Sequence, residues 1–172
     1  MNLRVANLTD PVPSFVRDTT KPNHLEGLPS KWEGTYVDFP QSHLVVDIPE
    51  PTSFRMMTTG LIVCSAVAIG FARARTESYG VFMSHTTPAL IQNATANILH
   101  AVSTAELEGY EPVFQATIGP NTARYAPGHE SLRGMLALIL DTTLDTIPDT
   151  RYLAPTRWDF IKTGDTFQVI AS

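Results

Sequence analysis

Cysteine and charge are both scarce in this sequence. One cysteine among 172 residues excludes an internal disulfide and a cysteine-rich zinc site. Charged residues make up 17% of the chain, below the roughly 25% that is usual in globular proteins. Lys and Arg number 12 against 17 Asp and Glu, and they form no basic run. We therefore expect a folded domain with an extensive core, and no nucleic acid among its partners.

Long apolar stretches and familiar catalytic motifs are also missing. The uncharged, largely apolar run 56–72 is at the lower limit for a membrane helix, and its alternation of large and small residues is typical of a strand. We therefore expect no interaction with a membrane. The sequence has no phosphate-binding or dinucleotide-binding glycine motif, no serine-hydrolase elbow and no paired-histidine zinc motif. Its five histidines have no metal-ligand spacing, so we expect neither a metal nor a cofactor.

Proline distinguishes the first part of the chain from the rest. Seven of the 13 prolines lie within the first 51 residues, which disfavours helices there. We expect residues 1–52 to form an extended arm packed on the domain, with 43–48 as its best strand. Residues 53–172 are expected to complete a single globular domain.

Hydrophobic patterning after residue 55 predicts strands and two helices. An apolar strand from 56 to about 74, a polar turn and a strand over 79–84 predict a hairpin. Apolar residues at helical spacing follow Pro88, and two threonines before it offer a hydroxyl cap, so a helix is predicted over about 88–104.

The remaining pattern completes the fold prediction. It comprises a strand over 111–119, a loop over 125–129, a helix from about 132 to 144 and a closing hairpin over 157–170. Clustered strands with two helices between them indicate an α+β fold of layered, sandwich-like sheets flanked by helices.

The single cysteine and one histidine suggest thiol chemistry. Cys64 lies in the apolar run and His85 at the end of the return strand, so a hairpin can bring them together at one edge of a sheet. A neighbouring histidine lowers the pKa of a thiol and protonates the leaving group. Cysteine is, however, among the most buried residue types, and the neighbours of Cys64 are aliphatic. Spacing alone favours a structural core cysteine over a nucleophile.

Two segments of the chain, 58–69 and 79–88, resemble the CheD-like glutamine deamidases. This superfamily contains a chemotaxis-receptor deamidase and the catalytic domains of cytotoxic necrotizing factor-type toxins. Its pattern is a Thr six residues before a Cys on an apolar strand, a short hairpin, and a His before a turn into a helix. Thr58, Cys64 and His85 occupy these positions. The resemblance covers roughly residues 55–170 and implies a CheD-like form of the α+β fold.

The resemblance also implies a cofactor-independent, cysteine-dependent protein glutamine deamidase. The Cys64 thiolate would attack the carboxamide carbon while nearby backbone N–H groups hold the oxyanion. His85 would protonate the departing ammonia and activate water to hydrolyse the thioester. Thr58 would orient His85, or Thr59 if the register is shifted by one. The expected partner is a protein that carries an exposed glutamine.

One departure from the family pattern keeps other interpretations open. The family has small residues, Gly and Ser, before the Cys, whereas this sequence has Ile62 and Val63. If the oxyanion-binding backbone is lost there, the chain is a CheD-like protein-interaction module without catalysis. A different thiol hydrolase, such as a peptidase or a transglutaminase-like enzyme, is a third interpretation.

The location and assembly of the protein are less constrained. The first 20 residues have no apolar secretory signal, which predicts a cytoplasmic protein, with delivery into a host cell as the alternative. The sequence does not predict an oligomeric state.

Overall fold

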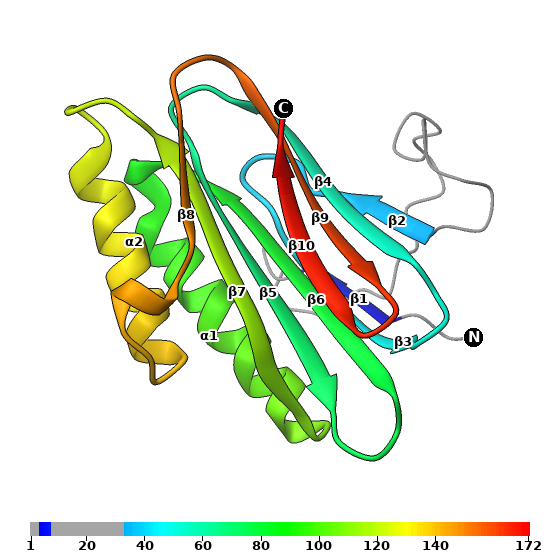
Figure 1. Cartoon of the computed structure of the whole chain (residues 1–172). Helices are drawn as coiled ribbons and strands as arrows, with labels where there is room; N and C mark the ends of the chain where they lie inside the picture. The colour runs from blue at the N-terminus through cyan, green and yellow to red at the C-terminus, as the bar shows by residue number, and fades with distance from the viewer. Residues whose placement is uncertain (1–3, 8–32) are drawn as a thin grey trace.

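Two sheets and a layer of helices make up the fold (Figure 1). The computed structural model describes residues 4–7 and 33–172. Within these residues the strands form one six-stranded and one four-stranded mixed sheet, and two α-helices cover the outer face of the larger sheet. The α+β class and the layered arrangement expected from the sequence are therefore confirmed.

The larger sheet holds the central hairpin of the molecule. Its strands, in spatial order, are β1 (Arg4–Asn7), β3 (Ser42–Pro49), β6 (Ser78–Thr86), β5 (Ser65–Arg73), β7 (Tyr110–Pro120) and β8 (Asp149–Tyr152). All neighbours are antiparallel except β7 and β8, which run parallel. The predicted strands over 43–48, 79–84 and 111–119 are present. The short strand β8 was not predicted.

The smaller sheet contains the closing hairpin. Its strands, in spatial order, are β10 (Thr166–Ala171), β9 (Thr156–Thr163), β4 (Phe54–Leu61) and β2 (Glu33–Tyr36). The predicted hairpin over 157–170 corresponds to β9 and β10. Strands β2 and β3 both come from the predicted arm, so residues 33–52 contribute to the two sheets. The rest of that arm, apart from β1, lies outside the described residues.

The expectation of one long strand from 56 to about 74 is wrong. This stretch forms β4 and β5, which belong to different sheets. Gly60 has a left-handed backbone (φ +71°), and residues 62–64 bend the chain from one sheet to the other. As a result, the end of β4 and the start of β5 face each other across the space between the sheets.

The helices differ from expectation mainly at their ends. A 3₁₀ turn over Pro88–Leu90 precedes α1 (Ile91–Leu107), and the Thr87 side chain makes no cap hydrogen bond. Helix α2 spans Ala126–Ile139, so the loop expected over 125–129 is largely helical. Proline fits this first helical turn because the N–H that it lacks would have no partner there. The expected helix end near residue 144 is also too late.

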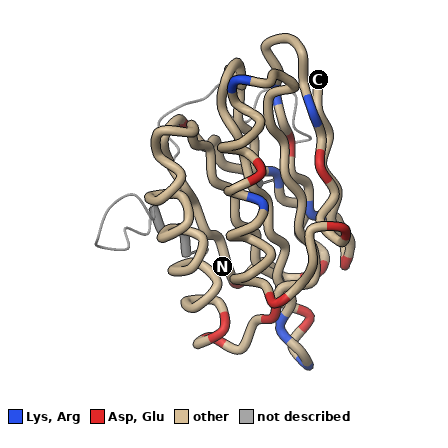
Figure 2. Tube along the Cα trace, turned by 90° about the vertical axis from the view of Figure 1, so that its left-hand side faces the viewer, with Lys and Arg blue, Asp and Glu red and all other residues tan. Residues whose placement is uncertain are grey.

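Each face of the larger sheet has its own core. Val67, Ile69 and Phe71 of β5 pack toward the helices, whereas Ala66 and Ala68 pack between the two sheets. This alternation along a strand buried on both sides explains the continuous apolar run. Figure 2 shows that the helices carry few charges, and Glu106 is the one charged residue of α1. None of the described helices is long and apolar enough to cross a membrane.

Candidate active site

Thr58 and His85 meet in the space between the two sheets. Thr58 lies on β4 and His85 on β6, and the Thr58 Oγ1 to His85 Nδ1 distance is 2.7 Å. The Thr58 hydroxyl also donates to the carbonyl of Val37 at 2.7 Å. Since a hydroxyl has a single proton, His85 must be the donor in the first bond, with its proton on Nδ1. Its Nε2 therefore carries a free lone pair.

His85 is buried and electrically neutral. Only 2% of the residue is exposed, and Phe39 packs edge-on against the imidazole with 5.5 Å between ring centroids. Burial lowers the pKa of His85 from 6.5 to about 4, although the nearby negative charge of Asp38 opposes this shift. No described residue hydrogen-bonds to His85 Nε2. A neutral imidazole with an unused lone pair is equipped to act as a base.

Cys64 lies immediately before β5 on the same side of the sheet as His85. It belongs to the buried cluster between the sheets together with Ala66, which pairs with His85 in the β5–β6 ladder. Burial raises the pKa of the Cys64 thiol, while the backbone N–H groups of Val63 and Ile62 act in the opposite direction. The expectation that His85 lowers this pKa is therefore not met, because desolvation dominates.

The two bulky residues before Cys64 lie in different environments, since Ile62 is exposed and Val63 packs against the buried cluster that holds Cys64. The Ile62 side chain is 61% exposed, so it points away from the thiol. The N–H groups of Ile62 and Val63 nevertheless face the sulfur closely enough to affect its pKa. Small residues are thus not required here to present backbone N–H groups to the Cys64 sulfur.

Thr59, the alternative to Thr58, has a different partner. Its hydroxyl bonds to the phenol of Tyr36 on the neighbouring strand β2. The structure therefore places Thr58, rather than Thr59, against His85. The three residues singled out from the sequence, Thr58, Cys64 and His85, lie in the same layer between the sheets.

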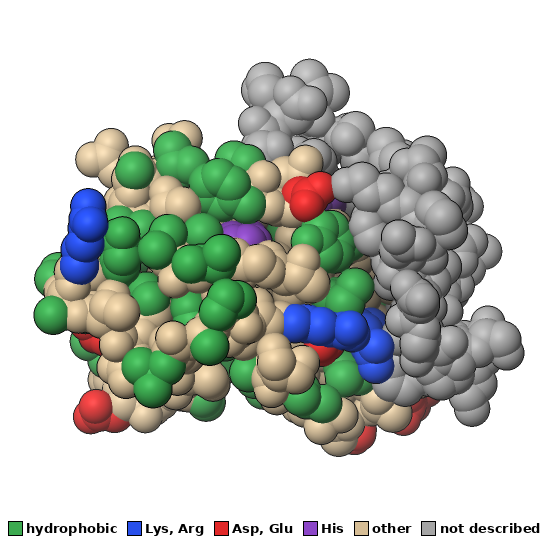
Figure 3. All heavy atoms as spheres, turned by 90° about the horizontal axis from the view of Figure 1, so that it is seen from above, with side chains coloured by type: hydrophobic (Ala, Val, Ile, Leu, Met, Phe, Trp, Pro, Cys, Tyr) green, Lys and Arg blue, Asp and Glu red, His purple; other side chains and the backbone are tan. Residues whose placement is uncertain are grey.

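Apolar side chains surround this end of the molecule. Ile62 on the β4–β5 connection and Leu153 on the β8–β9 connection are 61% and 82% exposed, and Phe39 over His85 is 45% exposed. Figure 3 views the molecule from the end where these two connections emerge, and hydrophobic side chains cover much of that face around a histidine. Such a rim suits contact with another protein surface.

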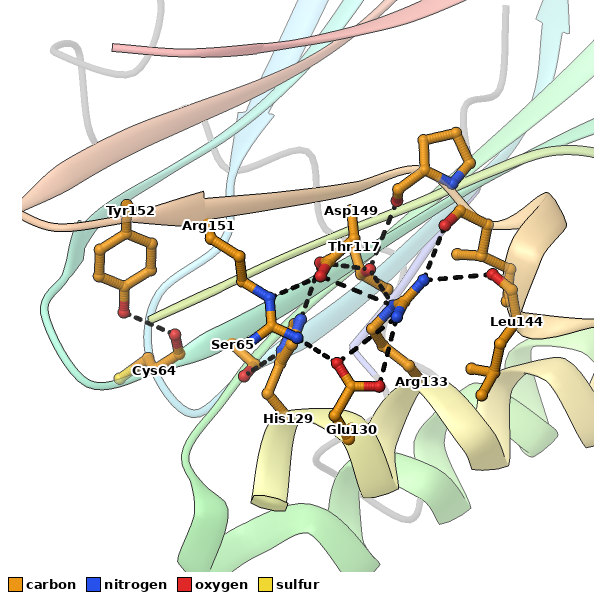
Figure 4. Close-up of polar contacts among 12 residues, drawn as sticks. Cys64, Ser65, Thr117, His129, Glu130, Arg133, Leu144, Asp149, Arg151 and Tyr152 are labelled. Atoms are coloured by element: carbon orange, nitrogen blue, oxygen red, sulfur yellow. Dashed lines mark hydrogen bonds and ion pairs between the residues drawn. The ribbon is translucent and has the colours of Figure 1, made fainter. Parts of the chain in front are cut away.

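A second polar cluster lies on the opposite side of β5, and sequence reasoning missed it (Figure 4). Ser65 Oγ is 2.7 Å from Nδ1 of His129, and His129 Nε2 is 2.8 Å from Oδ1 of Asp149. No spacing could reveal it, because the three residues come from β5, α2 and β8. Gly119 of β7 makes room for the His129 ring, since a Cβ there would lie 2.3 Å from Nδ1.

The carboxylate of Asp149 is the centre of this cluster. It accepts from Thr117 at 2.9 Å and pairs with Arg151 at 2.6 Å and Arg133 at 3.8 Å. Burial alone would raise the pKa of Asp149, but hydrogen bonds from His129, Arg151 and Thr117 outweigh it and lower this pKa to about 2. An ionised Asp149 accepts the Nε2 proton of His129, and the other ring nitrogen, Nδ1, shares a hydrogen bond with the Ser65 hydroxyl.

The residues Ser65, His129 and Asp149 are arranged in the order of a serine-hydrolase triad, but Ser65 is more enclosed than Cys64, which is 8% exposed. Ser65 is 2% exposed and His129 is fully buried beneath α2. A cavity of about 460 Å³ lies on the same side of the sheet, between α1 and β6, and its polar lining comes from Ser84, Thr86, Asn93 and Asn97. Neither Ser65 and His129 nor Cys64 and His85 are among its lining residues. We therefore assign the cluster no hydrolytic role of its own.

The described part of the chain has no group of three or more His, Cys, Asp or Glu side chains that could hold a metal ion. No protein-family model, curated protein or solved structure matches the chain.

Proposed function

We propose that the protein is a cysteine-dependent protein glutamine deamidase in which Cys64 is the nucleophile, His85 the base and Thr58 the residue that orients the base. The observation that carries the proposal is the chain of hydrogen bonds from His85 Nδ1 to Thr58 Oγ1 and on to the Val37 carbonyl. This chain holds the proton on Nδ1 and leaves Nε2 free on the side of the sheet that contains Cys64. A CheD-like arrangement of the α+β fold is part of the proposal.

The pKa directions favour general-base activation of a neutral thiol. Because burial raises the pKa of Cys64 and lowers that of His85, both groups are uncharged at neutral pH. His85 Nε2 takes the thiol proton as sulfur bonds to the glutamine carboxamide carbon. The carbon–nitrogen bond then breaks, and the same proton leaves with ammonia. Water hydrolyses the thioester with His85 again as base, which gives glutamate and the free thiol.

Two further features support a protein substrate. The N–H groups of Ile62 and Val63, which already face the sulfur, can donate to the oxyanion that forms on the carboxamide oxygen. The exposed Phe39, Ile62 and Leu153 offer an apolar contact for residues on either side of the glutamine. A thiol nucleophile must stay reduced, so we place the reaction in the cytoplasm.

Ammonia release tests the proposal directly. Unfolded casein serves as a protein probe with many accessible glutamines, and mass spectrometry of its peptides identifies conversion to glutamate. We expect the wild type to release ammonia, Cys64→Ala and His85→Ala to be inactive, and His100→Ala to retain activity. His100 is the matched control because it is an exposed histidine on α1. An active Cys64→Ala protein would overturn the assignment.

The second candidate is a CheD-like interaction module that lacks catalysis. The raised pKa of the Cys64 thiol is the observation that favours it, because a thiol that stays protonated is a poor nucleophile. Alkylation separates the two candidates. A thiol that iodoacetamide modifies only after denaturation, in a protein that releases no ammonia, identifies the interaction module.

A further inference from the structure

Strand β8 holds the backbone around Cys64 at two points. The phenol of Tyr152, at the end of β8, donates to the Cys64 carbonyl at 2.7 Å. Asp149, at its start, binds His129, which in turn is hydrogen-bonded to the Ser65 hydroxyl. The two contacts reach consecutive residues, and Figure 4 shows both beside β8.

The position of Cys64 in the chain makes such contacts important. The residue follows the bend at 62–63 and precedes the first residue of β5, so it lies outside both strand ladders. Its thiol must nevertheless stand at a defined place relative to His85. A displacement of about 1 Å can lower a catalytic rate roughly a hundredfold.

We propose that β8 positions the nucleophile, with Tyr152 holding the carbonyl of Cys64 and Asp149, through His129, holding Ser65. This inference rests on the proposed function, and it makes Tyr152 and Ser65 positioning residues rather than catalytic ones. The Tyr152 contact acts from the end of β8, and the Ser65 contact acts from the helix side of the sheet. Together they fix the direction of the peptide that joins Cys64 to Ser65.

The groups that make both contacts are themselves held in place. Tyr152 is buried, and burial together with the neighbouring Cys64 raises the pKa of its phenol, so the hydroxyl remains a donor throughout the working pH range. Asp149 is held by Thr117 and by the guanidinium groups of Arg133 and Arg151. A carboxylate with this many partners is a rigid anchor for the imidazole of His129.

Kinetics on two single-group deletions test the inference. Tyr152→Phe removes the hydroxyl that bonds to the Cys64 carbonyl, and Ser65→Ala removes the hydroxyl that bonds to His129. We expect each variant to lower kcat for ammonia release from casein roughly tenfold with KM within about twofold of wild type. The rate of Cys64 alkylation by iodoacetamide should not fall, because the thiol is present but misplaced.

Ser42→Ala is the matched control. Ser42 is a buried serine of the same sheet that bonds to another side chain, the hydroxyl of Ser84, at 2.8 Å. We expect this variant to lose stability comparably while keeping its kcat. In the double variant of Tyr152 and Ser65, the combined loss should be smaller than the product of the single losses, because both groups hold one peptide.

The outcomes separate this inference from the proposed function. An active wild type whose kcat is unchanged by both substitutions overturns the positioning role alone, as does an equal loss of kcat in Ser42→Ala. A wild type that releases no ammonia and whose thiol reacts only when unfolded overturns the proposed function, and the positioning role with it.

Discussion

The imidazole of His85 donates its Nδ1 proton to the hydroxyl of Thr58 across the space between two sheets. The residues are 27 positions apart, yet the two atoms are 2.7 Å from each other. The Thr58 hydroxyl in turn donates a hydrogen bond to the Val37 carbonyl, so the direction of both bonds is determined. The result is a buried histidine with one tautomer and one free nitrogen.

Replacing Thr58 should disturb this tautomer. We expect Thr58→Val to lower kcat for ammonia release by about 10²-fold or more, because the imidazole loses the acceptor that holds its proton on Nδ1. Thr58→Ser keeps the hydroxyl and should restore most of the activity. The control is Thr59→Val, since Thr59 bonds to Tyr36 instead. Equal losses in Thr58→Val and Thr59→Val would argue against an orienting role.

Alkylation of Cys64 should report a protonated thiol at neutral pH. Because burial raises the pKa of this thiol, the thiolate fraction at pH 7 is smaller than in an ordinary cysteine. We expect the iodoacetamide rate, followed by intact mass, to keep rising with pH beyond the range in which the denatured protein levels off. A fast, pH-independent rate below pH 7 would instead indicate a preformed thiolate–imidazolium pair.

The low pKa of His85 should make stability depend on pH. The folded state holds His85 neutral down to about pH 4, whereas the unfolded chain protonates it near 6.5. Between these values the unfolded state binds more protons, so the free energy of unfolding falls as the pH falls. At about 1.4 kcal/mol per pKa unit, the loss approaches about 3 kcal/mol. Urea unfolding from pH 7 to 4 should show this slope in the wild type and a smaller one in His85→Gln.

Gly119 should not tolerate a side chain. A Cβ at this position would lie 2.3 Å from Nδ1 of His129, so Gly119→Ala must displace the ring and break its bond to Ser65. We expect a loss of about 2–4 kcal/mol in urea unfolding. Gly134→Ala is the control, because no atom lies within 4 Å of its added Cβ and alanine favours the helix by roughly 0.5–1 kcal/mol. Similar stabilities for the two variants would contradict the close approach.

Lys162 should stabilise the β3–β4 turn. Its buried ammonium donates to three carbonyls, those of Pro49, Glu50 and Thr52, at 2.8, 2.7 and 2.9 Å. Burial lowers its pKa to about 8, so the ammonium form, with three protons to donate, predominates at pH 7. Lys162→Met keeps the aliphatic stem but leaves these three carbonyls without a hydrogen-bond donor. We expect the free energy of unfolding to fall by about 2–3 kcal/mol. The exposed Arg75→Met should change stability by less than about 0.5 kcal/mol.

The predictability of the elements follows their length and pattern. Alternation over 111–119 identified a strand because its residues alternate between two environments. The strands over 79–84 and 157–170 were identified from the turns that join them into hairpins. The split at Gly60 was missed, because an apolar run buried on both faces looks continuous. Strand β8, with four residues, is too short to show a period. Helix α2 was started too late, because Pro127 and Gly128 suggest a loop when they are read without their surroundings.

The sequence by itself determined the α+β class, most of the strands, both helices and the choice of Thr58, Cys64 and His85 as candidates. Hydrophobic patterning and a short motif are enough for these predictions, because both can be recognised from residues that are close together in the sequence. Only the tertiary structure decided that Thr58 bonds to His85 and that burial raises the pKa of the Cys64 thiol. It also decided that Tyr152 bonds to the Cys64 carbonyl and that Ser65, His129 and Asp149 form a cluster on the other side of β5. Burial and hydrogen bonding between distant segments depend on which surfaces pack together, and no stretch of sequence encodes that alone.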